Sequence, residues 1–153
     1  MPVVRVTTEV DAPPERIFDL ARDVDAHLDS MRRHGERVVG GRPSGRLAAG
    51  DEVEWRARHL GLPLRLRTRI VEFEPPVRFV DEQVRGPFAA MRHEHRFEQR
   101  TAGTLMTDVF AYDAPLGPLG RLVDALFLER YMRRLLMSRA AVLKRVAEAS
   151  KPA

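Results

Sequence analysis

The chain has 153 residues, 44% of them hydrophobic and 31% charged, which is typical of one folded domain and excludes a disordered or membrane-embedded class. It contains no cysteine, which excludes disulfides and thiol catalysis and favours a cytoplasmic location. Its net charge of +4 comes almost entirely from arginines interspersed with acids, so we expect solvated charged faces and no nucleic-acid partner. No run of about eighteen apolar residues predicts a transmembrane helix, and the N-terminus lacks the basic-then-apolar layout of a secretion signal.

The first part of the chain predicts a strand and then short helices. Apolar and polar residues alternate over residues 3–10, a pattern that indicates a strand. The stretch DAPPERIFDLARD begins a helix, because its two prolines pre-set the first helical turn. A second short helix is expected at about Val24–Leu28, and a further strand at 36–42.

The middle of the chain predicts a run of antiparallel strands. In DEVEWRARHL the Glu and Arg residues take one face, whereas Val53, Trp55, Ala57 and His59 take the other. The turn sequences GLP, PP, RGPF and RTAG separate such segments. The strands expected here are 51–60, 64–70, 78–84, 91–99 and 104–113.

A long helix is predicted from about Leu119 to Ala149, ended by Ser150 and Pro152. Because strands and helices do not alternate, we expect no parallel sheet. An antiparallel sheet must cover its apolar face, and only this helix is long enough to do so. The sequence therefore predicts a single α+β domain over residues 1–153. We expect a curved antiparallel sheet of six or seven strands around the last helix, two short helices after the first strand, and a pocket between sheet and helix.

These segments resemble the SRPBCC superfamily, whose START-like members have a helix-grip fold. The resemblance lies in APPERIFDLARD, PLRLRTRIVEFEPPVRFVDEQVRGPF, HEHRFE, GTLMTDVFAYDAPLGPLG and the final helix, which together span most of the chain. PPVRFVDEQVRGPF followed by GTLMTDVFAY resembles a bacterial polyketide cyclase/dehydrase-like subgroup. The resemblance implies a hydrophobic ligand cavity between sheet and helix. It implies no single reaction, because members include lipid carriers, hormone receptors, cyclases and hydroxylase domains.

The stretch MRHEHRFEQ has the H-x-H spacing of many metal sites, so the direction of its side chains matters. Its alternating Arg and Glu residues are expected in water, which turns Met91, His93, His95 and Phe97 inward and Glu94 outward. If the RTAG turn places Gln99 opposite Thr104, His95 faces Asp108 on the next strand. The other facing pairs are then Phe97 with Met106, His93 with Phe110, and Met91 with Tyr112.

Three interpretations are open for His93, His95 and Asp108. The one we favour is that His95 and Asp108 satisfy each other in a partly polar cavity wall. In the second, they contact a polar atom of an apolar ligand, for instance as an acid/base pair. The third is a metal site, for which two histidines on one strand and a single carboxylate are weak support.

Other residues on inward faces complete the expected ligand site. For Trp55 a core role is favoured over ligand contact, and of the acids in RFVDEQV we expect Asp81, together with Gln83, to point inward. No metal and no cofactor are expected. The ligand-contacting residues predicted are Trp55, His59, Leu66, Thr68, Asp81, Gln83, Met91, His93, His95, Phe97, Met106, Asp108, Phe110, Tyr112, Leu122 and Leu126.

The final helix carries two apolar stripes, one through Leu119, Leu122, Val123 and Leu126 and another from Leu128 to Val146. Either the helix bends near Phe127–Arg130, or its second apolar side meets a partner subunit or a membrane surface. Arg130, Arg133, Arg134 and Arg139 could serve a bilayer, but we favour a solvated face beside a buried one. We expect the protein to be a monomer or a homodimer.

Two functions remain. The first is the binding or carrying of a hydrophobic small molecule such as a lipid, isoprenoid or polyketide. The second is a polyketide cyclase or dehydratase that uses His95 and Asp108 as acid and base and Tyr112 as a donor. A protein-interaction role, resembling cochaperone members of the superfamily, is demanded by no feature of the sequence.

Overall fold

The computed structural model describes residues 1–149, with seven strands and a set of helical segments. The predicted helix-ending residues Ser150 and Pro152 lie outside the described residues. The strands are β1 (Val3–Val10), β2 (Arg37–Gly41), β3 (Glu52–His59), β4 (Leu62–Glu74), β5 (Arg78–Arg85), β6 (Ala90–Arg100) and β7 (Gly103–Asp113). The helical segments are α1 (Pro14–Ala21), α2 (Val24–Ser30), the 3₁₀ turn η1 (Arg32–His34), α3 (Gly117–Val123), the π-helical segment η2 (Asp124–Leu128) and α4 (Glu129–Ala149).

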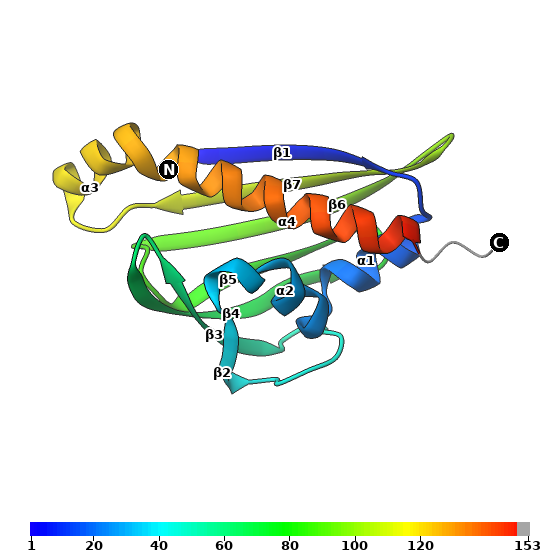
Figure 1. The fold of residues 1–153 in the computed structure, drawn as a ribbon, viewed down its shortest axis with the longest axis horizontal. Helices are drawn as coiled ribbons and strands as arrows, with labels where there is room; N and C mark the ends of the chain where they lie inside the picture. Colours follow the sequence, from blue (N-terminus) through cyan, green and yellow to red (C-terminus); the bar gives the residue numbers. More distant parts are fainter. Residues whose placement is uncertain (150–153) are drawn as a thin grey trace.

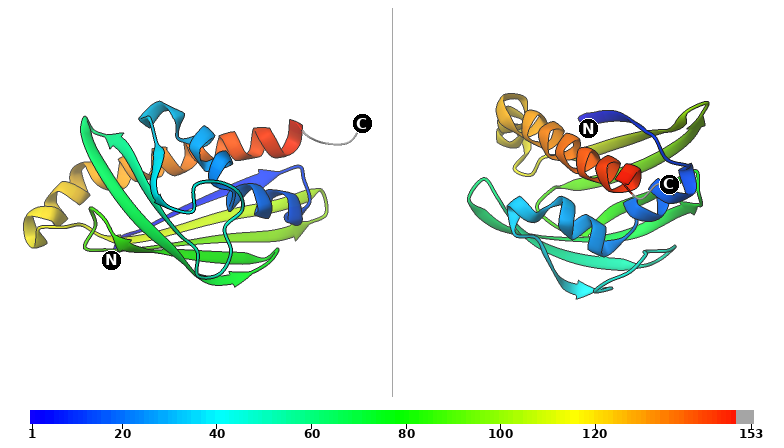
Figure 2. Two further views of the ribbon diagram at one scale, coloured as in Figure 1. Left: turned by 90° about the horizontal axis from the view of Figure 1, so that it is seen from below. Right: turned by 45° about the vertical axis from the view of Figure 1, so that its right-hand side comes forward.

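All seven strands form one sheet in the order β1-β7-β6-β5-β4-β3-β2, and every neighbouring pair is antiparallel. The sheet curves around α4, which crosses its concave side, while α1 and α2 lie beside the C-terminal half of α4 (Figures 1 and 2). The predicted α+β helix-grip fold is therefore confirmed.

The register of β6 and β7 places the histidines as the sequence predicts. His95 lies opposite Asp108, and His93 lies opposite Phe110. Alternate residues of β6 are buried from Met91 to Phe97, while the charged residues between them reach solvent. Period-two burial thus turns both imidazoles toward α4, and Glu94 points to the outer face.

The core has two parts, one at each end of α4. The first is centred on Phe18 of α1, whose ring packs edge-on against Phe79 and Phe97 at centroid distances of 5.5 and 5.4 Å. The second surrounds Tyr112 and Leu136. Since the chain packs densely at both ends of the helix, the space between the two parts can stay open without loss of the fold.

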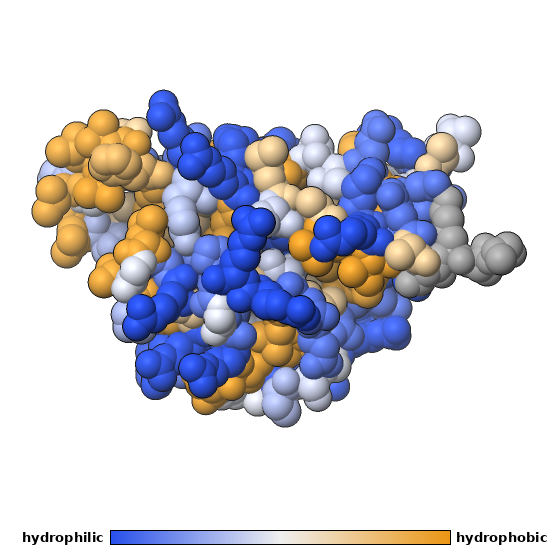
Figure 3. All heavy atoms as spheres, in the orientation of Figure 1, coloured by the Kyte–Doolittle hydropathy of each residue, from blue (hydrophilic) through white to orange (hydrophobic). Residues whose placement is uncertain are grey.

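The C-terminal helical region is interrupted by η2, which overlaps the start of the bend predicted at Phe127–Arg130. The stripe from Leu128 onward packs toward the sheet, with Met132 and Leu143 buried. The other stripe is exposed, and Figure 3 shows hydrophobic residues gathered over α3. Leu122 and Leu126 are 56% and 53% exposed and neither lines the cavity described below, which differs from their prediction as cavity residues. None of the described helices has the length and apolar character needed to cross a bilayer.

The turn before α1 is tied to the sheet by Thr104, whose buried hydroxyl donates to the carbonyl oxygen of Ala12 at 2.7 Å. Replacing Thr104 with the isosteric Val leaves that carbonyl without its partner. We expect the free energy of unfolding, measured in urea, to fall by about 1–2 kcal/mol. Thr101→Val in the exposed β6–β7 turn is the control and should change it by less than about 0.5 kcal/mol. Equal effects of the two substitutions would contradict the assignment.

Candidate ligand cavity

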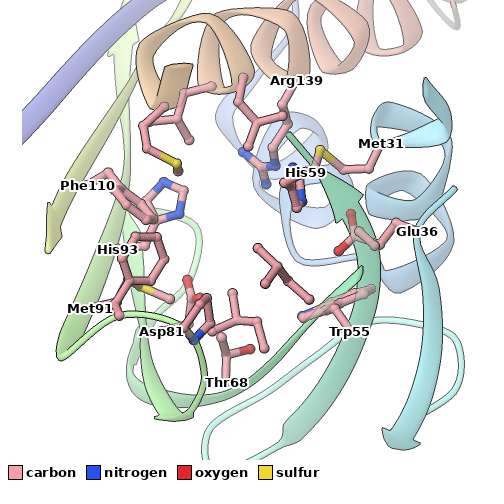
Figure 4. A pocket seen from close by; sticks show the side chains of 18 of the residues that line it. Met31, Glu36, Trp55, His59, Thr68, Asp81, Met91, His93, Phe110 and Arg139 are labelled. Atoms are coloured by element: carbon pink, nitrogen blue, oxygen red, sulfur yellow. The ribbon is translucent and has the colours of Figure 1, made fainter. Parts of the chain in front are cut away.

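A cavity of about 370 Å³ lies between the concave face of the sheet and α4. Most of its lining is apolar, and Figure 4 shows side chains from β3, β6 and α4 converging on one space. It reaches the surface beside the β3–β4 turn and the segment before α3, where Leu60 and Leu116 are 69% and 75% exposed. A volume of this size holds a small organic molecule.

One wall of the cavity carries a group of polar side chains that we call the His–Asp cluster: Asp81, His93, His95 and Asp108, with Arg139 above them. Nε2 of His93 donates to Oδ1 of Asp108 at 2.9 Å, and Nε2 of His95 donates to Oδ1 of Asp81 at 2.9 Å. Nδ1 of His95 also lies 3.1 Å from Oδ1 of Asp108, at ion-pair distance but without hydrogen-bond geometry. Asp108 therefore serves both imidazoles.

The two histidines have opposite pKa shifts. Burial and the neighbouring charge of His95 lower the pKa of His93 to about 4. Burial also acts to lower the pKa of His95, but its contacts with Asp108 and Asp81 outweigh burial and raise that pKa. Their ring centroids are 3.8 Å apart, so a proton on one ring disfavours a proton on the other, and His95 is the ring that holds its proton more strongly.

The carboxylates of the His–Asp cluster stay ionised. Burial favours the protonated form of Asp108, but the contacts with His93 and His95 outweigh it and hold the pKa of Asp108 well below its usual range. Burial likewise opposes ionisation of Asp81, but its bond to His95 prevails and the pKa of Asp81 is lowered. The two carboxylates are thus surrounded by basic groups, namely the two imidazoles and the guanidinium of Arg139.

Arg139 comes from α4 and completes this wall. Its Nη1 lies 3.5 Å from Oδ1 of Asp108, and its Nη2 donates to the carbonyl oxygen of Ala21 at the end of α1. The prediction that groups Arg139 with arginines able to serve a bilayer is wrong, because its side chain is 6% exposed. Arg139 lies three residues after Leu136 and four before Leu143, which puts it on the buried stripe of α4. This spacing could have predicted its burial from the sequence.

The opposite wall carries a second polar group. Nε2 of His27 on α2 lies 3.1 Å from Oε1 of Glu36, and the His27 ring packs on Trp55 with a centroid distance of 4.2 Å. Farther along this wall, Nδ1 of His59 lies 2.6 Å from the hydroxyl of Tyr131. Burial and then the charge of His34 lower the pKa of His59. Glu36, His27 and Tyr131 were not predicted from the sequence, although Glu36, directly before β2, shares its partial burial with Val38 two residues later.

More than half of the predicted ligand residues line the cavity. These are Trp55, His59, Leu66, Thr68, Asp81, Met91, His93, His95 and Phe110.

The remaining predicted residues do not line it, for several physical reasons. Phe97 and Met106 are buried in the core around Phe18, below the cavity floor. Asp108 lies behind the two imidazoles, and the side-chain amide of Gln83 is bonded to the backbone of Phe88. The hydroxyl of Tyr112 donates to Asp124 in η2, so it faces the helix and not the ligand space. Leu122 and Leu126 are exposed, as described above.

One group among the described residues could hold a metal ion, and it is part of the His–Asp cluster. Asp81, His93 and His95 each offer a ligand atom, and these atoms lie within 4.8 Å of one another. Both Nε2 atoms are already bonded to carboxylates, and Arg139 places a positive charge beside Asp108. A bound cation would have to break those bonds and approach the guanidinium, which works against it.

The sequence matches the family model described as "Polyketide cyclase / dehydrase and lipid transport" over residues 1–148. No curated protein matches it.

Solved structures share the fold at low sequence identity. Protein TTHA0849 from Thermus thermophilus is 22% identical with a TM-score of 0.81, and the match covers 99% of this chain and 100% of that one. Major latex-like protein 151 from Panax ginseng is 13% identical with a TM-score of 0.66, covering 95% and 97%. The di-domain ARO/CYC StfQ from the steffimycin biosynthetic pathway is 16% identical with a TM-score of 0.74, covering 96% of this chain and 50% of that one.

The lowered pKa of His93 predicts a specific dependence of stability on pH. As pH falls below about 6.5, the unfolded chain takes up the His93 proton while the folded protein does not until about pH 4. His93 therefore removes about 2 kcal/mol of stability between pH 7 and pH 5. The measurement is urea unfolding of the wild type and of His93→Gln, whose amide can still donate to Asp108. Between pH 7 and pH 5 the free energy of unfolding should fall by about 2 kcal/mol more in the wild type than in the variant. A matching loss in both proteins would show that the pKa of His93 is not lowered.

Proposed function

The chain belongs to the polyketide cyclase/dehydrase and lipid transport family, and from this premise we propose that it binds and carries a hydrophobic small molecule in the cavity under α4. The observation that supports the proposal is a mostly apolar cavity of about 370 Å³ beside a polar cluster in which acids pair with bases. The free energy falls when an apolar ligand displaces water from an apolar cavity of this kind. A lipid, an isoprenoid or a polyketide-like compound has the required character.

The carrier proposal also agrees with the way the His–Asp cluster is built. Its hydrogen bonds run mainly between its own members and hold β5, β6 and β7 together. A wall whose polar groups are held mainly by contacts with one another presents a fixed shape to an apolar ligand. Recognition then rests on shape and on the few polar atoms that remain free.

A second candidate is an enzyme of the cyclase or dehydratase type, and the opposite pKa shifts of His93 and His95 favour it. An imidazole with a raised pKa beside one with a lowered pKa is an arrangement in which the first can give a proton to a substrate oxygen while the second can accept one. Both rings line the cavity. Tyr112, predicted as a donor, does not reach the ligand space, so this mechanism relies on the histidines alone.

The carrier proposal predicts binding that the single tryptophan can report. An environment-sensitive hydrophobic dye should bind and quench the fluorescence of Trp55, which lies in the cavity wall. Ala57→Phe fills part of the cavity and should weaken binding by about tenfold, because overpacking a site costs about 1–3 kcal/mol. Ala111→Phe is the matched control, since residue 111 lies on the outer face of β7 between Phe110 and Tyr112. Equal binding by all three folded proteins would argue for a core with no usable pocket.

Asp108→Asn separates the carrier from the enzyme, because it keeps the shape of the side chain and removes its charge. For a carrier, we expect a stability loss of about 1–3 kcal/mol and a modest change in dye affinity. For a cyclase or dehydratase, conversion of a linear polyketide-type substrate, followed by mass spectrometry, should fall by about 10²–10⁴-fold while binding survives. Asp29→Asn, at an exposed ion pair with Arg32, is the control and should change neither measurement. The absence of turnover in the wild type would favour the carrier.

A further inference from the structure

Glu36 faces the His–Asp cluster across the cavity, from a wall of different composition. It lies between η1 and β2, directly after Gly35, whose left-handed backbone (φ 60°) ends the 3₁₀ turn. Figure 4 shows its carboxylate directed into the space between Met31 and Trp55, with the His–Asp cluster on the other side. The turn therefore delivers an acidic side chain into a wall where its nearest neighbours in the lining are Met31, Trp55 and its partner His27.

Only one oxygen of this carboxylate is used by the protein. Oε1 is bonded to Nε2 of His27, whereas Oε2 is buried and has no hydrogen-bond partner among the described residues. The Glu36 side chain is 6% exposed. Three other buried polar atoms lack such a partner. Oδ2 of Asp108 belongs to a residue that does not line the cavity, whereas Nδ1 of His95 and Nη1 of Arg139 lie at ion-pair distance from Asp108. A buried acceptor without a partner costs free energy, so its retention at a cavity wall points to a donor that arrives from the cavity.

The orientation of the Glu36 carboxylate is held by its neighbours. His27 is on α2, and its ring packs against the indole of Trp55 on β3, so two elements fix the donor that holds Oε1. The free oxygen consequently has a defined direction before any ligand binds. Such preorganisation favours a ligand whose polar atom sits at one position on an apolar body.

We propose that Oε2 of Glu36 accepts a hydrogen bond from a hydroxyl group of the ligand, and that the ligand is a neutral, largely apolar alcohol or phenol. The inference rests on the proposed function and specifies its ligand class. A carboxylate accepts hydrogen bonds and donates none, so a ligand with only ether or carbonyl oxygens cannot satisfy it. An anionic ligand such as a carboxylate is repelled from it, and an ammonium group loses its hydration in the apolar space.

Three probes with one shared ring system test this by titration calorimetry at pH 7: 2-naphthol, 2-methoxynaphthalene and 2-naphthoate. The wild type should bind 2-naphthol at least about tenfold more tightly than 2-methoxynaphthalene, as expected of a hydrogen bond to a charged group. Naphthoate should bind most weakly. Glu36→Gln keeps the shape and one acceptor but loses the charge, so the naphthol preference should shrink. In Glu36→Leu the preference should disappear while 2-methoxynaphthalene still binds.

Glu54→Gln is the matched control, because it removes a carboxylate that pairs with Arg65 and Arg67 instead of lining the cavity. It should keep the wild-type preference. A preference that is unchanged in both Glu36 variants, or naphthoate binding more tightly than naphthol, overturns the inference while the carrier proposal stands. If Glu36→Leu does not fold, Glu36→Gln decides alone. Failure of the folded wild type to bind any of the probes overturns the proposed function and this inference with it.

Discussion

The buried carboxylate of Asp108 is the constraint on which the arrangement of this protein depends. A charge that is 1% exposed must be neutralised by close partners, and its partners come from β6 and α4. Arg139 can reach Asp108 only if α4 lies across the concave face at one height, and the same guanidinium holds the end of α1. The position of the helix, and with it the height of the cavity roof, is therefore set by electrostatics as well as by packing. Removing Arg139 would take one ionic partner from this buried carboxylate and would also remove the bond that holds the end of α1.

The two polar walls of the cavity differ in the contacts that their polar groups make. The His–Asp cluster forms hydrogen bonds within itself, while Nδ1 of His95 and Nη1 of Arg139 make only ionic contacts with Asp108. The Glu36 side leaves one oxygen free, next to an indole and a methionine. The His–Asp cluster therefore uses most of its polar contacts to join strands and helix, whereas the Glu36 wall offers an acceptor oxygen that has no ionic partner besides His27 in the described part of the chain. This division explains how a space that is mostly apolar can still select among ligands of similar size and hydrophobicity.

Much of the fold, and about half of the site, could be predicted from the period of the sequence. Alternation in MRHEHRFEQ, together with the RTAG turn, was sufficient to place His95 opposite Asp108, because strand pairing transmits register over many residues. The nearest hydrogen bond differs from that expectation: Asp108 accepts from His93, and His95 turns toward Asp81 on β5. Side-chain rotation allows such diagonal contacts, and strand periodicity carries no information about it. The exposed Leu122 and Leu126 could not be placed because the π-helical segment shifts the phase between α3 and α4.

The pairing of β1 with β7 also governs the timing of assembly. Thr104 and its partner Ala12 are 92 positions apart, and the contacts between α1 and the end of α4 span a still longer stretch. Pairings that close such long loops form slowly compared with hairpins. The hairpins from β3 to β7 can therefore form before β1 pairs with β7. During synthesis on the ribosome, the N-terminal strand and α1 emerge long before the segments that cover them. A nascent chain therefore has no closed binding chamber until its last helix is released, and it must keep its apolar N-terminal segments from aggregating until then.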